Sequence, residues 1–253
     1  EEKKKPIKLD GHRGIVWDLV FSGKTLFSLG RDGKIIQWDM SNQEQLQVIN
    51  TEEKIRAISI NNSVIAGASL SGSIFLWNQN GGGKEVLTID EDSYYSVQFS
   101  HGGQFIVAGD RNGFVKVWDA KTKELITVLE GQNARINDLV FSDDDRMLAS
   151  ASSDKSVQVW HMDKLNDQPL ALSDHEWWVF AIAFDPDNKN LISGCSDHLI
   201  RKWPLNTEEM AAQVGLEMQR NISEKEWHRY VADDIPYEKT IEHLPLGEGV
   251  LEE

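Results

Sequence analysis

Hydrophobic and polar residues alternate in short runs along most of the chain, and five of these runs end on a tryptophan. The five are separated by 39, 41, 42 and 43 residues, and they are Trp38, Trp77, Trp118, Trp160 and Trp203. Alternation with a period of two is typical of strands, because successive side chains point to opposite faces of a sheet. Repeats of about 40 to 45 residues predict units of four short strands, so we expect an all-β fold.

Further motifs stand at fixed places within these repeats. Gly11-His12 opens the first repeat and Trp38-Asp39 closes it. A turn residue precedes the tryptophan by six positions in every repeat, and these residues are Asp32, Ser71, Asn112, Asp154 and Asp197. With this spacing, residues 9–205 resemble the WD-repeat family, whose members are β-propellers. The resemblance implies a WD-repeat propeller with five visible blades, fewer than most members have, which favours a larger propeller.

The resemblance also implies a polar network in each blade, made by a His, a Ser or Thr, an Asp and a Trp. Such groups need partners, because an unpaired buried polar group costs about 1–3 kcal/mol. The full set stands in the first and fifth repeats, as His12, Ser28, Asp32 and Trp38, and as His175, Ser193, Asp197 and Trp203. The fourth repeat keeps Ser150, Asp154 and Trp160 but has Gln132 in place of the His. Repeats two and three lack the set, so packing against their neighbours is expected to hold them.

Each of these histidines and aspartates alone would resemble a catalytic or metal-binding residue. They recur in successive repeats, whereas a catalytic constellation would occur once, so we interpret them as structural. We expect no catalytic residue, metal site or cofactor: Gly81-Gly82-Gly83-Lys84 lacks phosphate-loop spacing and is expected to form a turn. Asp143-Asp144-Asp145 is expected in a hairpin turn and not at a calcium site. The segment is therefore expected not to be an enzyme, and a hydrolase that uses a central channel is the alternative.

Charge and cysteine content narrow the function further. The chain has 26 Lys and Arg against 41 Asp and Glu, a net charge of −15, which argues against a general nucleic-acid binder. Residues 207–253 hold 12 acidic and 4 basic residues, so the repeats themselves are only mildly acidic. The lone Cys195 excludes a disulfide framework and favours a reducing compartment. No run of 18 apolar residues is present, so we expect a cytoplasmic segment that does not cross a membrane.

Family geometry places three side chains of each repeat on the top surface, where the innermost strand begins. In chain order these are Ile15, Trp17, Arg31, Lys54, Arg56, Leu70, Ser93, Tyr95, Arg111, Arg135, Asn137, Ser153, Trp178, Phe180 and Ser196. None is acidic, five are Arg or Lys and four are aromatic, the types enriched at interface centres. The alternative is that the aromatic residues only pack against neighbouring blades. We favour a binding surface for an acidic or phosphate-bearing protein or peptide, anchored by the aromatic residues and paired with the arginines.

The alternation stops after Trp203-Pro204, so we expect two domains, the propeller blades in residues 1–205 and an acidic tail in residues 206–253. Met210, Val214 and Met218 are spaced as on one face of a helix, and Ser223-Glu224-Lys225-Glu226 forms a capping-box pattern. A helical and then extended tail is expected. The stretch from Arg220 to Pro245 is similar to a C-terminal signature of large bacterial WD-repeat proteins. In those proteins the propeller follows a STAND-type NTPase or a caspase-like domain.

Taken with that resemblance, the sequence favours a noncatalytic sensor module whose partner binding regulates its own upstream domain. A standalone scaffold and an autoinhibitory surface need the same exposed face, so the sequence leaves both open. Closure of a ring of five blades would require residues 6–9 to supply the outer strand of the last blade.

Overall fold

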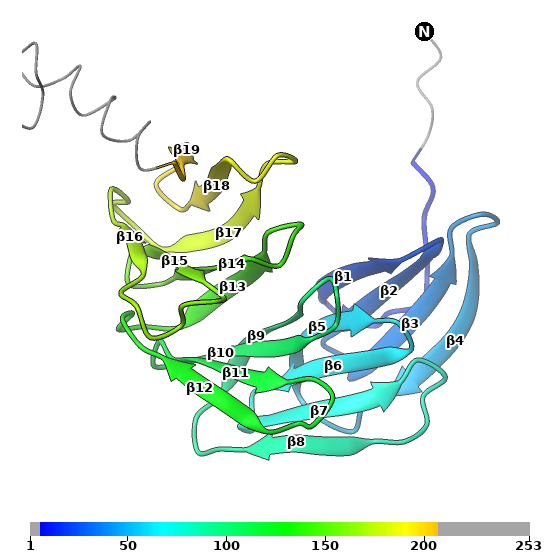
Figure 1. The fold of residues 1–253 in the computed structure, drawn as a ribbon. Coiled ribbons are helices and arrows are strands. Elements are labelled where there is room, and N and C mark those ends of the chain that lie inside the picture. Colours follow the sequence, from blue (N-terminus) through cyan, green and yellow to red (C-terminus); the bar gives the residue numbers. More distant parts are fainter. Residues whose placement is uncertain (1–5, 207–253) are drawn as a thin grey trace, which may run out of the picture. The chain divides into compact units, whose positions relative to one another are not determined.

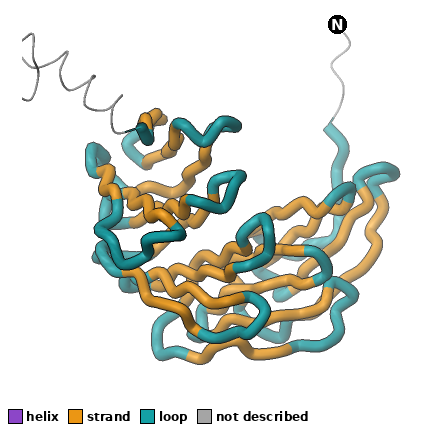
Figure 2. The backbone as a smooth tube through the Cα atoms, viewed as in Figure 1, coloured by secondary structure: helices purple, strands orange, loops and turns teal. Residues whose placement is uncertain are grey.

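The computed structural model describes residues 6–206, and every regular element in this part is a β-strand (Figure 1) (Figure 2). The strands form four four-stranded sheets and one three-stranded sheet, each with its strands paired in sequence order. The prediction of an all-β fold with blade-like sheets is confirmed. The expected tail helices lie outside the described residues. No helix within residues 6–206 could cross a membrane.

We number the sheets as blades in chain order. Blade 1 comprises β1 (Val16–Ser22), β2 (Thr25–Gly30), β3 (Lys34–Asp39) and β4 (Glu44–Asn50). Blade 2 comprises β5 (Ile55–Asn61), β6 (Val64–Ser69), β7 (Ser73–Asn78) and β8 (Glu85–Ile89). Blade 3 comprises β9 (Tyr94–Phe99), β10 (Phe105–Asp110), β11 (Val115–Asp119) and β12 (Leu125–Leu129). Blade 4 comprises β13 (Ile136–Phe141), β14 (Met147–Ser152), β15 (Val157–His161) and β16 (Leu170–Leu172), and blade 5 comprises β17 (Val179–Phe184), β18 (Asn190–Cys195) and β19 (Ile200–Pro204).

The first strands of successive blades are neighbours in space, β1 beside β5, β5 beside β9, β9 beside β13 and β13 beside β17. The strands of a blade are antiparallel and follow one another in the sequence. Each first strand therefore begins on one side of the propeller blades, and the turn that connects it to the second strand lies on the opposite side. We call the side of the strand starts the top surface and the side of these turns the bottom surface. The Asp143-Asp144-Asp145 segment forms the β13–β14 turn on the bottom surface, as predicted.

The core lies between neighbouring blades. One cluster joins Phe27, Leu29 and Ile35 of blade 1 to Ile55 and Ile58 of blade 2. Equivalent clusters join blades 2 and 3 and blades 3 and 4. Each blade therefore buries its apolar faces against the blades beside it, as a repeat architecture requires.

The fifth blade differs from the other four because it has no fourth strand within the described residues. The strand that residues 6–9 would have to supply for a ring of five blades does not form, because these residues adopt no regular structure. Instead, Leu9 packs against Leu26, Ile36 and Trp38 of blade 1. The N-terminal segment thus covers the first blade. By its contacts the chain divides into two units, Glu1–Trp203 and Pro204–Glu253.

Candidate functional site

A β-bulge interrupts the pairing near the start of the first strand in every blade. In blade 1, Val16 pairs with Gly30 and Asp18 pairs with Leu29, so the residue between them has no partner. The same register shift occurs in the other four blades. The five bulged residues are Trp17, Arg56, Tyr95, Asn137 and Phe180. A bulge bends the strand and re-aims a side chain, so the backbone itself displays these five positions.

All five bulged side chains line one hollow beside the first strands, which we call the bulge hollow. Its aromatic members are not isolated. The guanidinium carbon of Arg56 lies 5.5 Å from the centre of the Trp17 ring, and that of Arg135 lies 4.9 Å from the centre of the Tyr95 ring. Stacking of this kind contributes about 0.5–2 kcal/mol and holds the guanidinium plane in place.

Asn137 ties the hollow to the blades around it. Its side-chain oxygen accepts a hydrogen bond of 2.7 Å from Nε of Arg135, and its Nδ2 donates to the carbonyl of Val179 at 2.7 Å. Nδ2 also lies 3.0 Å from Oγ of Ser153. The bulged Phe180 packs edge-to-face against Trp178, with ring centres 6.2 Å apart. Arg135 and Trp178 are therefore positioned by bulged residues without lining the hollow themselves.

Two carboxylates stand deeper in the bulge hollow, Asp18 and Asp138. Asp18 accepts the backbone N–H of Ile58 in the next blade at 2.8 Å, and Asp138 accepts that of Ile182 at 3.0 Å. Burial raises the pKa of Asp18, against the lowering effect of the N–H groups and of Arg56. Burial also raises the pKa of Asp138 to about 6, and the charge of Asp18 adds to the rise. These carboxylates join consecutive first strands.

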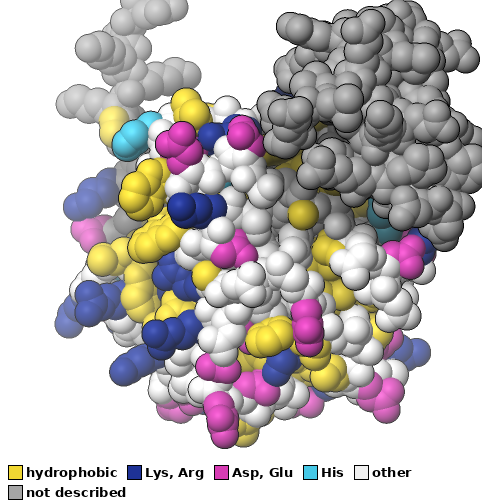
Figure 3. Space-filling view, turned by 90° about the vertical axis from the view of Figure 1, so that its left-hand side faces the viewer, with side chains coloured by type: hydrophobic (Ala, Val, Ile, Leu, Met, Phe, Trp, Pro, Cys, Tyr) yellow, Lys and Arg dark blue, Asp and Glu magenta, His cyan; other side chains and the backbone are white. Residues whose placement is uncertain are grey.

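Among the described residues, the cations predicted for the top surface take part in no ion pair of the side chains. Within residues 6–206, no ion pair forms at these five side chains: Arg31, Lys54, Arg56, Arg111 and Arg135. By contrast, Lys116 and Lys123 pair with carboxylates at 2.8 Å and 2.5 Å. On the face drawn in Figure 3, Lys and Arg side chains gather among hydrophobic ones along one margin, and most Asp and Glu lie elsewhere. Basic side chains are therefore more frequent than acidic ones along this margin, despite the acidic balance of the chain.

The remaining top-surface residues lie around the bulge hollow. A second hollow between blades 1 and 2 contains Trp17, Arg31, Lys54 and Leu70, and its lining also includes Asp32, Glu52 and Glu53. Sequence reasoning assigned Asp32 to the polar network of the first repeat, and it missed Glu52 and Glu53, which lie in the loop just before Lys54. Ser93 donates to the carbonyl of Leu70 at 2.7 Å. Ile15, Arg111 and Ser196 are exposed.

The polar network of blade 1 forms from the four residues expected. Nε2 of His12 and Nε1 of Trp38 both lie 2.8 Å from Oγ of Ser28, and Nδ1 of His12 lies 3.0 Å from Asp32. Asp32 also accepts the backbone N–H of Arg13 at 2.9 Å. Burial alone would raise the pKa of Asp32, but the Arg13 N–H and His12 lower it overall. The network joins the top turn to the blade interior.

Blade 5 keeps only part of this network. Ser193 lies 2.8 Å from both Nε2 of His175 and Nε1 of Trp203, but the expected His–Asp bond does not form. Asp197 instead accepts from Arg201 at 2.7 Å, while Nδ1 of His175 makes no hydrogen bond of normal geometry within the described residues. Burial, together with the charge of Arg201, lowers the pKa of His175. Burial would raise the pKa of Asp197, but the Leu199 N–H and Arg201 lower it to about 2.

Blade 4 uses its glutamine in place of the histidine. Ser150 donates to Oε1 of Gln132, and Nε2 of Gln132 donates to the carbonyl oxygen of Ser156 at 3.1 Å. Asp154 does not reach Gln132 but accepts from the hydroxyl of Ser156 at 2.6 Å. Trp160 is buried. The substitution therefore preserves one link of the network and redirects the aspartate.

Blade 3 has a network that the sequence reasoning missed. Asp90 stands ten positions before Ser100, as His12 does before Ser22, and it pairs with Lys116 at 2.8 Å. The buried Tyr94 hydroxyl donates to the same carboxylate. Burial would raise the pKa of Asp90, but Lys116 and Tyr94 lower it overall. Counting ten positions back from Ser100, the serine after the first strand of blade 3, would have identified Asp90.

Among residues 6–206, no group of three or more His, Cys, Asp or Glu side chains is arranged to hold a metal ion. The polar groups of the bulge hollow are amide, guanidinium, hydroxyl, indole N–H and backbone-bonded carboxylate groups. This arrangement suits noncovalent recognition of a chain segment, because stacked arginines present donors in a fixed geometry.

The model of the family described as "WD domain, G-beta repeat" matches residues 3–39, 83–119, 123–161 and 167–204. The matches cover more than half of the chain. Residues 40–82, which include the first three strands of blade 2, fall outside them. That repeat has Thr51 and Ser71 where the first repeat has His12 and Asp32.

Several characterised proteins are similar to the chain. Protein ROOT INITIATION DEFECTIVE 3 of Arabidopsis thaliana is 25% identical over 202 residues, which cover 72% of this chain and 46% of that protein. The human WD repeat and SOCS box-containing protein 1 is 29% identical over 118 residues, covering 46% of this chain and 28% of that protein. Mouse Jouberin is 25% identical over 168 residues, covering 65% and 15%. The chain spans less than half the length of each of these relatives.

Proposed function

Because the chain belongs to the WD domain, G-beta repeat family, we propose that it is a noncatalytic module that binds a protein or peptide segment in the bulge hollow. Repeats of this family support a protein-interaction role in general. The finer proposal concerns where and what this chain binds.

The observation that carries the proposal is the coincidence of five bulges with one hollow. Each blade breaks its own pairing at the residue that lines this hollow, at the expense of a regular ladder. Three of the five residues are aromatic and one is Arg, which are the types that dominate interface energetics. The bulged residue lines the hollow in all five blades, so the repeat displays one side chain of each blade at the same place.

An acidic or phosphate-bearing segment fits the arginines beside the hollow, since the carboxylates of Asp18 and Asp138 in the hollow already accept backbone N–H groups. Arg56 and Arg135 are stacked on aromatic rings, and neither forms an ion pair with a carboxylate within residues 6–206. A guanidinium group that is already stacked on an aromatic ring loses little side-chain entropy when it binds a carboxylate or phosphate. We propose that Trp17, Tyr95 and Phe180 anchor the segment and that the arginines set its charge preference.

We also propose that this binding regulates a domain elsewhere in a longer bacterial, cytoplasmic protein. The support is the tail signature in residues 220–245 and the partial coverage of the relatives. Cys195 is free, which suits a reducing compartment. A ligand regulates such a domain only by binding one of its states more tightly.

The test is a selection of displayed random peptides on the chain at low salt. We expect enrichment of acidic residues beside apolar ones, because both the arginines and the rings contribute. The affinity of a selected peptide is then measured by calorimetry for the chain and for the double variant Arg56→Glu/Arg111→Glu. We expect about tenfold weaker binding or more, because each reversal turns attraction into repulsion.

The matched control is Lys121→Glu/Lys164→Glu, which makes the same charge change at exposed positions on the bottom surface. It should leave the affinity within about twofold, since distant exposed charges are screened. A second variant, Arg31→Glu/Arg111→Glu, avoids the contact of Arg56 with Trp17. Equal affinity of the chain and both top-surface variants would refute the proposal.

A further inference from the structure

Another hollow opens on the bottom surface, between the turns of blades 3 to 5, and we call it the bottom hollow. Its volume is about 860 Å³, which is in the range of ligand sites. It shares no lining residue with the bulge hollow. Blades 3 and 4 supply most of its lining, and each of them has a neighbouring blade on both sides. The hollow is therefore not produced by an end of the stack.

The apolar part of the lining consists of Phe105, Met147 and Met162. Phe105 and Met162 pack against the buried cluster that joins blades 3 and 4, yet all three side chains remain partly exposed. Methionine side chains are unbranched and polarizable, so they adapt to apolar groups of different shapes. This part of the hollow therefore suits contact with an apolar side chain of a partner.

The polar part of the lining is acidic. It contains four carboxylates, from Asp144, Asp145, Asp163 and Asp187, and one guanidinium group, from Arg146. The other polar side chains of the lining are those of Gln104, His161 and Asn188. A hollow that is lined by charges of one sign attracts ligands of the opposite sign.

Asp163 and Asp187 are the carboxylates most available to a partner, because both are exposed. The side chain of Asp163 forms no ion pair within residues 6–206, and that of Asp187 forms only a long one, 3.8 Å from Nζ of Lys189. The ion pair of Asp144 with Arg146 is also long, at 3.7 Å. Exposed ion pairs contribute little free energy, so a cation of a partner can replace them.

A neighbouring hollow shows that the acidic lining is not a general feature of the bottom surface. Between the bottom turns of blades 2 and 3, a hollow lined by Trp77 and Phe99 contains one carboxylate, that of Glu85. Lys123 lines the same hollow and forms an ion pair with Glu85. The excess of carboxylates over cations thus distinguishes the bottom hollow from its neighbour.

We propose that the bottom hollow binds a basic segment of another protein, in which lysine or arginine residues flank an apolar residue. The apolar residue packs on Phe105, Met147 and Met162, and the cations pair with Asp163 and Asp187. Because the chain has a net charge of −15, we expect the complementary charge on a different polypeptide and not on a second copy. The proposal does not depend on what binds the bulge hollow, because the two hollows differ in surface and in preferred charge.

The test uses a short fluorescent peptide as the probe, with a leucine at its centre and lysines and arginines on both sides. Its affinity for the whole chain is measured by fluorescence anisotropy at about 0.15 M salt, where distant charges are screened. The double variant Asp163→Lys/Asp187→Lys should bind the probe at least about tenfold more weakly, because two attractions become repulsions. Both side chains are exposed, so its thermal melt should match that of the unmodified chain.

The matched control is Glu91→Lys/Glu130→Lys, which makes the same change of charge at exposed positions in the top loops before β9 and β13. It should keep the affinity for the probe within about twofold. An equal loss in both double variants would overturn the proposal, because the probe would then respond to the net charge of the chain. Unchanged affinity of Asp163→Lys/Asp187→Lys, or no binding of the probe by the unmodified chain, would also overturn it.

A second measurement tests the apolar contact. Replacing the central leucine of the probe by serine should weaken binding several times, since the apolar part of the hollow would lose its partner. Oxidative footprinting should show that the original probe protects Met147 and Met162, whereas Met40 in the bottom turn of blade 1 is oxidised equally with and without it. Binding of the probe without protection of Met147 and Met162 would contradict the proposal.

Discussion

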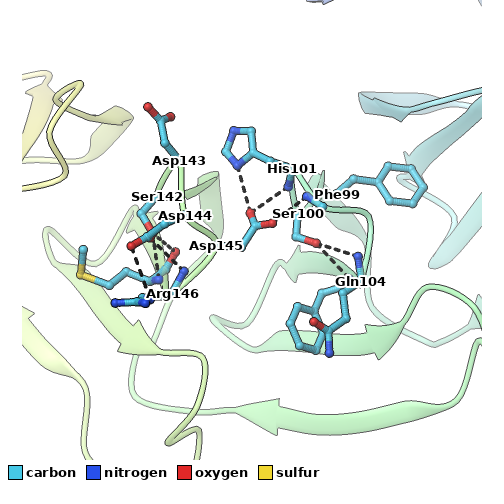
Figure 4. A network of polar contacts seen from close by, with 12 residues as sticks. Phe99, Ser100, His101, Gln104, Ser142, Asp143, Asp144, Asp145 and Arg146 are labelled. Atoms are coloured by element: carbon cyan, nitrogen blue, oxygen red, sulfur yellow. Dashed lines mark hydrogen bonds and ion pairs between the residues drawn. The ribbon is translucent and has the colours of Figure 1, made fainter.

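The top and bottom surfaces are built from the same strands but use their polar side chains differently. On the bottom surface, side chains of the turns bind the backbone of the neighbouring blade (Figure 4). Asp145 accepts the N–H groups of His101 and Gly102 at 2.8 Å and 2.7 Å, and it lies 3.0 Å from Nδ1 of His101. Asn61 likewise donates to the carbonyl of Ser100 at 3.1 Å. On the top surface, the arginines of the predicted site have no acidic partner within residues 6–206.

The turn backbone shows why the bottom surface can do this. Gly103, Asp145 and Asn188 occupy equivalent turn positions with φ between 57° and 70°, and Gly23 and Asn62 in the shorter turns of blades 1 and 2 have φ of 60° and 50°. Gly, Asn and Asp tolerate this left-handed conformation, so they are favoured there. The bottom side chains therefore serve the turns and the contacts between blades, whereas the arginines of the predicted top site form no ion pair within residues 6–206. The comparison predicts that bottom substitutions lower stability and top substitutions lower binding.

The largest effect on stability is expected from Asp145→Ala. The change removes the acceptor of two backbone N–H groups and places alanine at a φ of 57°, so unfolding should become easier by about 2 kcal/mol. Denaturant unfolding measures this. Asp145→Asn, which keeps the backbone preference and one acceptor oxygen, should lose less. Weaker binding of the selected peptide by Asp145→Ala would contradict the prediction that substitutions on the bottom surface lower stability and not binding.

A smaller effect depends on pH and concerns the carboxylates that join the first strands. The pKa of Asp138 is raised to about 6, so the folded chain binds its proton more tightly than the unfolded chain does. Stability from this group is therefore fully present at low pH and is lost as pH rises through about 6. Between pH 5 and pH 7, the unmodified chain should lose about 1–2 kcal/mol relative to Asp138→Asn.

The difference between the two proteins is the quantity to follow, measured by denaturant unfolding at several pH values. Titrating groups that do not interact with Asp138 act in both proteins and cancel, including His175, whose lowered pKa gives the opposite trend. Asp18 interacts with Asp138, so the difference reports the pair. A difference that does not change between pH 5 and pH 7 would show that Asp138 titrates in its ordinary range.

The smallest effects on stability are expected at the top. Arg111 is exposed and forms no ion pair within residues 6–206, so Arg111→Ala should change the free energy of unfolding by less than about 0.5 kcal/mol. The same variant should bind the selected peptide several times more weakly. If Arg111→Ala lowered the free energy of unfolding without weakening peptide binding, Arg111 would be a structural residue. The proposed binding site would then consist of the bulge hollow alone.

Much of the fold could be predicted from the repeats, since the spacing of the tryptophans located the third strand of each blade. Through family geometry, the sequence also selected the five residues that the structure places at the bulges, which are Trp17, Arg56, Tyr95, Asn137 and Phe180. It did not reveal the bulges, because pairing register depends on the partner strand and not on the residue alone. Nor did it reveal that Asp197 accepts a hydrogen bond from Arg201 and not from His175, or that Asp90 pairs with Lys116. The partner of a polar side chain depends on which other side chains the fold brings near it.

The exposure of a side chain on a first strand could not be predicted from the strand alone. Leu19 and Leu139 stand in the same motif, Asp-Leu-Val-Phe-Ser, yet one is 59% exposed and the other 4%. Their difference arises from the neighbouring blade and not from the strand itself.

The most direct test of the central claim, that a partner occupies the bulge hollow, is oxidative footprinting of the chain with and without a selected peptide. The account predicts protection of Trp17, Tyr95 and Phe180 by the peptide. Met147 and Met162 line the bottom hollow, between the turns of blades 3 to 5, and they should be oxidised equally in both samples. Protection of the two methionines with unchanged oxidation of the three aromatic residues would contradict it.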